Sequence, residues 1–175
     1  MEKNNFAAII DLKISNLHNV KLACDIVGIP NIITSNPKII SNAKSIILPG
    51  VGSFKEAMGK INFYKMSKVI KKSIKDKKPF LGICLGMQLL FNSSFEFGKC
   101  KGLGILKGEI KKLKFHEDKN FKYSIPHTGW NRINLTNKKN KFKMVSGLRK
   151  TEFMYFVHSF YVFAKEKKYV QYIMM

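Results

Sequence analysis

The first ninety residues of the chain alternate between short apolar runs and longer segments in which polar and apolar residues mix. A short apolar run bounded by glycine or proline is typical of a buried strand, and apolar positions three or four apart are typical of a helix. Strands and helices that follow each other in this way predict an α/β fold. The predicted strands are residues 6–11, 31–34, 44–48 and 80–83, and the predicted helices are residues 16–27, 55–60, 64–75 and 85–91.

The pattern changes after Gly108, where apolar runs follow each other with few helical segments between them. The lysine- and asparagine-rich residues 136–143 are predicted to form a loop. No repeat and no long linker divides the sequence, so we expect a single domain over residues 1–175. The strands predicted in this second half are residues 109–115, 132–135, 153–163 and 169–174.

Length and composition are those of one globular domain. The chain has 175 residues, of which 45% are hydrophobic, enough to form a substantial core. No stretch approaches the roughly 20 apolar residues of a membrane span. The apolar part of the N-terminal segment is interrupted by Asp11 and lacks the pattern of a signal peptide. We therefore expect a cytoplasmic protein with no membrane partner.

The formal charge of +21 raises the possibility of nucleic-acid binding. Only Arg132 and Arg149 are arginines, however, and the remaining positive charge is lysine scattered in small clusters along the chain. Arginine is the residue preferred for forked contacts with bases and phosphates. We therefore interpret most of the lysines as solvated surface and expect no nucleic-acid partner.

One segment combines an apolar strand, a tight turn and a helix around a cysteine. Gly82 and Gly86 lie two residues on either side of Cys84, a spacing that resembles a nucleophile elbow with a thiol in place of a serine. The glycines allow the tight turn, and the N-terminus of the next helix favours a thiolate. A buried structural cysteine would give the same spacing, but the position of Cys84 at the end of a strand favours a nucleophile.

A second apolar strand ends in the loop Pro-Gly-Val-Gly, which includes Gly50 and Gly52. The carboxyl ends of parallel strands meet at one edge of a sheet, where ligands bind. Glycine-rich backbone can there present N–H groups to a developing oxyanion. An ordinary turn between strand and helix would look the same, but together with the cysteine this loop is a candidate oxyanion hole.

Four segments, in order along the chain, resemble one family. Residues 49–54 (Pro-Gly-Val-Gly-Ser-Phe), 82–90 (Gly-Ile-Cys-Leu-Gly-Met-Gln-Leu-Leu) and 126–131 (Pro-His-Thr-Gly-Trp-Asn) look like class I glutamine amidotransferases. More narrowly, with residues 155–161, they resemble the glutaminase subunit of imidazole glycerol phosphate synthases. The resemblance implies a mixed, mainly parallel sheet flanked by helices, without the last strands of the family.

The resemblance also implies a mechanism and a set of site residues. Cys84 would attack the side-chain carboxamide of glutamine, ammonia would leave, and water would release glutamate from the thioester. Glu96 suits this substrate because the α-ammonium of glutamine needs a carboxylate. The implied oxyanion hole is Val51, Gly52 and Leu85, and the implied glutamine contacts are Gly50, Gln88, Glu96 and Ser159.

The family's partner is a β/α-barrel cyclase subunit of histidine biosynthesis, which receives the ammonia within a heterodimer. Trp130 and Asn131, which we predict to lie in a Gly-Trp-Asn turn, are the candidate partner-facing residues. The resemblance implies no cofactor. The cysteines Cys24, Cys84 and Cys100 form neither metal-ligand spacing nor an even disulfide set, so we expect no metal and a reducing compartment.

The catalytic base and its acid have no counterpart in this sequence. In the family they lie late in the chain, in a segment reading roughly Phe-His-Pro-Glu, and this chain contains no His-Pro pair. We therefore expect a C-terminally incomplete domain of an active enzyme. Of the histidines present, His158 is the best substitute for the base, although a structural role is the better interpretation. The others are His18, His116 and His127.

Two alternatives remain open. A paralogous amidotransferase that amidates a sugar for surface polysaccharide would carry the same motifs around the thiol. A non-catalytic pseudo-amidotransferase, which binds a partner or glutamine without turnover, would account directly for the missing base and acid.

Overall fold

The computed structural model describes residues 5–114, 125–135, 147–166 and 172–174. Backbone contacts divide the chain into two compact units, Met1–Glu109 and Ile110–Met175. The predicted loop 136–143, His116 and residues 169–171 of the last predicted strand lie outside the described residues.

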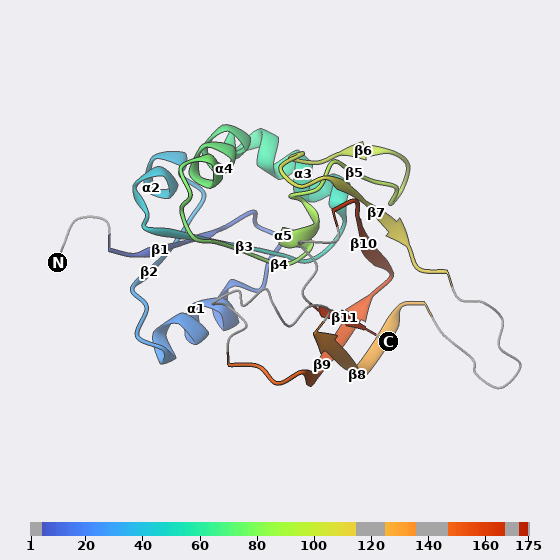
Figure 1. Cartoon of the computed structure of the whole chain (residues 1–175). Coiled ribbons are helices and arrows are strands. Elements are labelled where there is room, and N and C mark those ends of the chain that lie inside the picture. The colour runs from blue at the N-terminus through green and yellow to red at the C-terminus, as the bar shows by residue number, and fades with distance from the viewer. Residues whose placement is uncertain (1–4, 115–124, 136–146, 167–171, 175) are drawn as a thin grey trace, which may run out of the picture. The chain divides into compact units, whose positions relative to one another are not determined.

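The first unit contains a four-stranded parallel sheet. Its strands are β1 (Ala7–Ile10), β2 (Asn31–Thr34), β3 (Ser45–Gly50) and β4 (Phe80–Cys84), hydrogen-bonded in the order β2-β1-β3-β4 (Figure 1). All three pairings are parallel, and every residue of β1 is buried, as expected for a strand covered on both faces. The α/β class predicted from the sequence is confirmed.

Helices cover both faces of this sheet. α1 (Leu17–Ile26) lies on one face, while α2 (Pro37–Asn42), α3 (Phe54–Phe63) and α4 (Met66–Lys75) lie on the other (Figure 1). The fully buried core joins aliphatic side chains of the strands to side chains of α2, α3 and α4. Its largest members from these elements are Ile9, Ile10, Ile40, Ile46, Leu48, Phe54, Ile61, Met66 and Ile70.

Four short elements of this unit differ from the prediction. The helix α2 was not predicted, although Asn36 caps it by accepting the N–H of Lys38 and Pro37 occupies its first turn. The helix α5 (Leu85–Gln88) is shorter than the predicted residues 85–91. The two-residue strands β5 (Ser93–Ser94) and β6 (Cys100–Lys101) pair in antiparallel orientation and were also not predicted.

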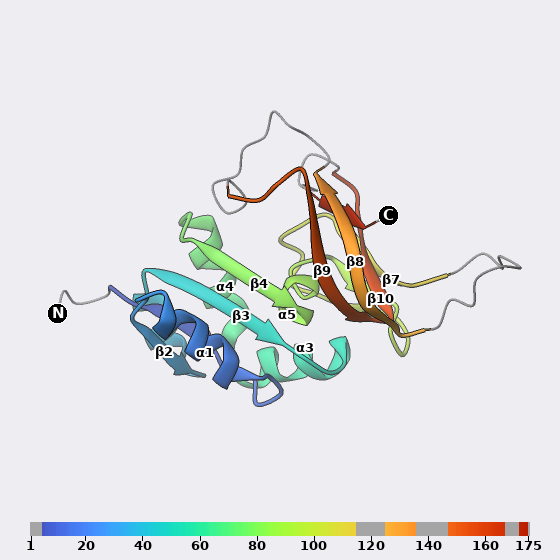
Figure 2. The ribbon, with the colours of Figure 1, turned by 90° about the horizontal axis from the view of Figure 1, so that it is seen from below.

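The second unit is made of strands. Its three-stranded sheet contains β8 (His127–Leu135), β9 (Thr151–His158) and β11 (Tyr172–Met174). The strands are hydrogen-bonded in the order β11-β8-β9, and both pairings are antiparallel. The views show β8 and β9 lying side by side along their length (Figure 2). β10 (Phe160–Ala164) neighbours β7 (Gly108–Lys112), which runs across the boundary between the units.

Two predictions for this unit are wrong. Trp130 and Asn131 do not lie in a turn but in the middle of β8, because this segment pairs with β9 over eight consecutive positions. Residues 153–163 are not one strand, since the extended backbone is interrupted at Ser159 between β9 and β10. Both errors concern pairing between distant segments, which local patterns do not fix.

Candidate active site

Cys84 occupies a strained position at the end of a strand. It is the last residue of β4 and the N-cap of α5, with φ of 52° and ψ of −115°. A residue with a side chain seldom adopts positive φ, and such conformations are concentrated at functional sites. The side chain is exposed. This is the predicted nucleophile elbow: a tight strand–turn–helix geometry that holds a thiol open to solvent.

The two glycines around Cys84 are required by close backbone contacts. A Cβ atom added at Gly82 would lie 2.7 Å from Cα and 2.8 Å from N of Met87. At Gly86 an added Cβ would collide with the carbonyl oxygen of Leu48, a residue of the neighbouring strand β3. The turn can therefore form only with glycine at both positions.

The helix after the cysteine is only one turn long. The sequence predicted a helix through residue 91, but α5 ends at Gln88 and the chain continues in turns to Phe91. Leu85, the first residue of α5, is buried. The helix dipole available to Cys84 is accordingly that of a single turn.

The glycine-rich loop after β3 lies against this elbow. Gly50 is directly opposite Cys84 in the register of β3 and β4. A Cβ atom added at Gly50 would lie 3.0 Å from N of Gly86 and 3.1 Å from Cβ of Leu85. Gly52 has φ of +86°, and the side chain of Val51 is 52% exposed. The structure therefore brings all the predicted oxyanion-hole segments to one edge of the sheet.

The loop after β1 also reaches this edge, which the sequence analysis did not predict. The Ser15 hydroxyl donates to the carbonyl oxygen of Pro49 at 3.2 Å. Asp11 is buried, accepts the N–H of Lys13 at 2.7 Å, and pairs with its ammonium at 2.6 Å. The hydrogen bond with Asp11 raises the pKa of the exposed Lys13. An acidic residue directly after a buried strand was the available signal.

Glu96 is tied to the start of helix α3. Its Oε2 accepts the N–H of Phe54 at 2.8 Å, and its own N–H donates to the Ser94 hydroxyl at 3.1 Å. Phe54 is the first residue of α3 and follows the glycine-rich loop by one residue. The carboxylate thus lies next to that loop, in a half-buried position. Gln88, at the end of α5, is half-buried as well.

The remaining predicted site residues belong to the second unit. The carbonyl oxygen of Ser159 accepts the N–H of Leu113 at 2.9 Å. Trp130 and Asn131 are consecutive residues of a strand and therefore point to opposite faces. Trp130 is 70% exposed, and its ring meets that of Tyr155 edge to face at 5.7 Å. Nε2 of His127 lies 2.7 Å from Nδ2 of Asn131, so this ring nitrogen is the acceptor.

His158 has contacts typical of a structural histidine. Its Nδ1 lies 3.0 Å from the carbonyl oxygen of Phe160, which can only accept, so Nδ1 carries the proton. Its Nε2 is buried without a hydrogen-bond partner among the described residues. The ring packs edge to face with His127, the residue opposite it in the register, at 5.5 Å.

The other cysteines differ from Cys84. Cys24 is buried in α1, and this burial raises the pKa of its thiol, while Cys100 is half-buried in β6.

Within the described ranges, no group of three or more His, Cys, Asp or Glu side chains is placed to hold a metal ion. In the same ranges, none of the helices is both long enough and apolar enough to cross a membrane.

The exposed Cys84 thiol lies on a glycine-bounded elbow opposite a glycine-rich loop, at one edge of a parallel sheet. The comparisons with known proteins agree with this geometry. The sequence model of the family described as glutamine amidotransferase class-I matches residues 4–173. The chain belongs to this family.

Within the family, the chain is similar to proteins named imidazole glycerol phosphate synthase subunit HisH. HisH 1 of Campylobacter jejuni is 44% identical over 161 residues, which cover 91% of this chain and 77% of that protein. HisH of Bacillus subtilis is 40% identical over 161 residues, covering 91% of this chain and 73% of its own length. These relatives do not favour the sugar-amidating or the non-catalytic alternative.

Solved structures agree on the fold. The structure of PurLQS from Thermotoga maritima matches with a TM-score of 0.69 and 20% identity, covering 99% of this chain and 75% of that one. A structure described as glutamine amidotransferase matches with a TM-score of 0.62 and 14% identity, covering 86% and 70%. The fold class and the family predicted from the sequence are thus confirmed.

Proposed function

We propose that this chain is the glutaminase subunit of an imidazole glycerol phosphate synthase. The observation that carries the proposal is the elbow itself: an exposed Cys84 held at φ of 52°, directly opposite Gly50. The similarity to HisH subunits supports the choice of synthase. In this proposal the 175 residues form part of one glutaminase domain of histidine biosynthesis.

The chemistry is a two-step acyl transfer. The Cys84 sulfur attacks the carboxamide carbon of glutamine, and the carbonyl oxygen becomes an oxyanion. We assign the backbone N–H groups of Val51, Gly52 and Leu85 to this oxyanion. The assignment is supported by Gly50, which precedes Val51 and lies opposite Cys84 in the register of β3 and β4. The C–N bond then breaks, the nitrogen takes a proton and leaves as ammonia, and water cleaves the thioester to glutamate and the free thiol.

The substrate contacts follow from charge and position. Glutamine carries an α-ammonium, and the Glu96 carboxylate lies beside the glycine-rich loop through its hydrogen bond to Phe54. We assign Glu96 to this ammonium, and Gly50, Gln88 and Ser159 to further contacts with glutamine.

We also assign a partner surface to the second unit. Alternate residues of β8 and β9 place Trp130, Phe153, Tyr155 and Val157 on one face of the sheet, each at least 55% exposed. A contiguous exposed aromatic face of this kind marks an interaction site. We propose that the β/α-barrel cyclase subunit docks here. Asn131 points to the opposite face, where His127 holds its amide.

The test of the glutamine site is covalent labelling with 6-diazo-5-oxo-L-norleucine, a glutamine analogue that alkylates amidotransferase thiols. We expect label on Cys84, protection by glutamine but not by asparagine, and no label in Cys84→Ser. Equal labelling of Cys24, Cys84 and Cys100 without protection by glutamine would contradict the proposal.

The origin of the catalytic histidine, the general base of the family, is tested by sequencing the gene beyond codon 175. The HisH relatives extend beyond the matched region, since the chain covers 77% and 73% of their lengths. If the reading frame beyond codon 175, or a frame one base away, encodes an apolar strand followed by Phe-His-Pro-Glu, the complete triad belongs to this protein. A stop with no such coding segment in any frame would leave a glutamine-binding protein without turnover.

A further inference from the structure

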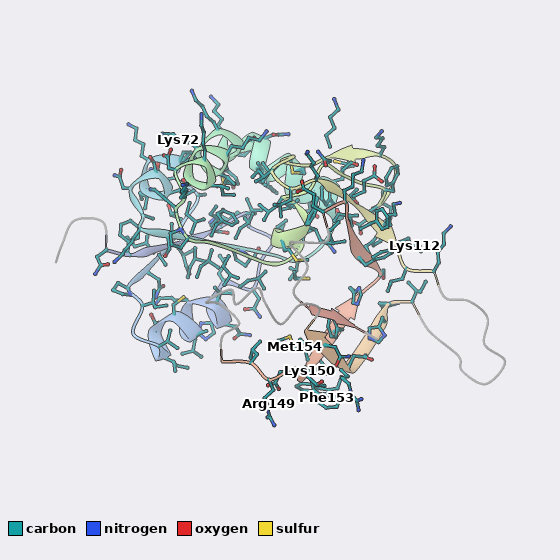
Figure 3. All side chains as sticks on the ribbon, viewed as in Figure 1. Lys72, Lys112, Arg149, Lys150, Phe153 and Met154 are labelled. Carbon is teal, nitrogen blue, oxygen red and sulfur yellow. The ribbon has the colours of Figure 1, made fainter. Side chains whose placement is uncertain are left out.

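A hollow of about 490 Å³ lies between helices α2 and α4 of the first unit. None of the described residues that line it is acidic. Figure 3 labels one of its lysines, Lys72, on α4. Besides Pro37 and Val69, the lining consists of four exposed lysines and two polar side chains: Lys38, Lys65, Lys68, Lys72, Ser41 and Asn42.

The positive charges around this hollow are largely uncompensated. Among the described residues, Lys38, Lys65 and Lys68 take part in no ion pair. Lys72 pairs with Asp76 at 2.8 Å, one turn further along α4 and outside the lining. Like charges around one open hollow repel each other, and an anion bound among them would lower that repulsion.

Folding does not explain why these lysines lie where they do. Lys38 is in the first turn of α2, Lys65 directly precedes α4, and Lys68 is in its first turn. Cations are unfavourable at the positive end of a helix dipole. Lys78 shows the favourable case, since its ammonium hydrogen-bonds the Ser41 and Ala43 carbonyl oxygens at the C-terminal end of α2. Local electrostatic conflicts, such as lysines at the N-terminal end of a helix, are expected at functional sites.

We propose that the hollow binds a soluble oligophosphate, that is, two or more phosphate groups in a row carried by a small molecule. Its volume is that of a small-ligand site. Lysine ammonium groups bind phosphate as point charges, and the hydroxyl of Ser41 and the amide of Asn42 can donate further hydrogen bonds. Neither α2 nor α4 carries a residue assigned to the glutamine site, so this proposal is independent of the proposed function.

The test is isothermal titration calorimetry of the whole chain with inorganic tripolyphosphate in 150 mM salt. The variant is Lys38→Gln/Lys65→Gln/Lys68→Gln. The matched control is Lys71→Gln/Lys75→Gln/Lys99→Gln, which removes the same charge from exposed lysines outside the lining. Circular dichroism melting of both variants establishes that they fold. Adenosine triphosphate and orthophosphate are titrated in parallel, to separate a nucleotide and a single phosphate from the bare oligophosphate.

We expect saturable binding of tripolyphosphate with one site per chain. The affinity should be at least tenfold weaker in Lys38→Gln/Lys65→Gln/Lys68→Gln and should change less than threefold in the control variant. Orthophosphate should bind at least tenfold more weakly than tripolyphosphate. An equal loss in both variants would mean diffuse attraction by the net charge and would overturn the proposal. Absence of binding by the unmodified chain in 150 mM salt would also overturn it. Tighter binding of adenosine triphosphate would support the site and identify a nucleotide as its ligand.

Discussion

Gly86 and Leu48 are in such close contact that no side chain fits between them: a Cβ atom on Gly86 would collide with the Leu48 carbonyl oxygen. This contact joins the turn after β4 to the neighbouring strand β3. Because backbone forms the obstacle, it cannot be removed by a change of side-chain rotamer. The position of the thiol is therefore fixed by packing of main chain on main chain.

The first prediction concerns this contact. Gly86→Ala should destabilise the fold by about 1–3 kcal/mol, the usual cost of overpacking, and should displace Cys84. Urea denaturation followed by circular dichroism measures the loss. The control is Gly59→Ala in α3, where an added Cβ meets nothing within 4 Å. That variant should gain about 0.5–1 kcal/mol, because alanine loses less backbone entropy in a helix. Equal effects of the two variants would contradict the clash at Gly86.

The second prediction concerns the order in which the cysteines react. Iodoacetamide should modify the exposed Cys84 well before the buried Cys24, whose pKa is raised by burial. The reaction of Cys24 should accelerate as the pH rises towards its raised pKa, and unfolding in urea should abolish the difference. Peptide mass spectrometry at a series of pH values measures both rates. Modification of Cys24 at the rate of Cys84 in the folded chain would refute this order.

The raised pKa of the Cys24 thiol also makes the free energy of unfolding depend on pH. Above the ordinary thiol pKa, the unfolded chain releases a proton that the folded chain still holds. This contribution to stability is therefore complete below the ordinary thiol pKa and is lost as the pH rises through the raised value. Cys24→Ala should remove that alkaline dependence in urea titrations, whereas Cys100→Ala should not.

The third prediction separates two roles of Glu96. Glu96→Ala removes the acceptor of the Phe54 N–H and should cost about 0.5–2 kcal/mol, as for loss of a helix cap. Glu96→Gln keeps an acceptor and should cost less, but it loses the charge that we assign to the α-ammonium of glutamine. Glutamine should therefore protect Cys84 from alkylation much less well in Glu96→Gln. Full protection in that variant would leave Glu96 with a capping role alone.

The fourth prediction concerns the aromatic face of β8 and β9. Phe153 and Met154 are consecutive residues of β9, both labelled in Figure 3, and so point to opposite faces of the sheet. Trp130→Ala and Phe153→Ala should each weaken binding of the barrel subunit at least tenfold, as expected for buried aromatic contacts. Met154→Ala on the other face should change it little. Calorimetry with the barrel subunit of the same organism measures the affinities, and a larger loss in Met154→Ala would place the interface on the other face.

The parts that the sequence predicted well are those set by neighbouring residues. The parallel strands and the elbow around Cys84 follow from apolar runs and glycine spacing, and the boundaries of β2 agree with residues 31–34. Helix α2 was missed because it is only six residues long and too short for an apolar period, although its Asn-Pro start was visible. The strand β8 was mistaken for a turn at Trp130, because only its partner β9, beyond residue 150, stabilises extended backbone there.

The site was predicted in the same uneven way. Cys84, Gly50 and the loop after β3 converge as expected, because parallel strands end at one edge. The part played by Ser15 could not be predicted, since it depends on a hydrogen bond across 34 residues to Pro49. Asp11 was missed although its position directly after a buried strand was an available signal. The opposite directions of Trp130 and Asn131 follow only once both are known to lie in a strand.

The aromatic face has a consequence for the chain on its own. Two copies could meet through Trp130, Phe153 and Tyr155, and this association would compete with the proposed heterodimer. The net charge of +21 opposes such self-association, because copies repel each other over about 10 Å at moderate salt. Salt screens that repulsion, so the colloidal stability of the free subunit should fall as ionic strength rises. In a cell, balanced synthesis of the two subunits would then keep this surface covered.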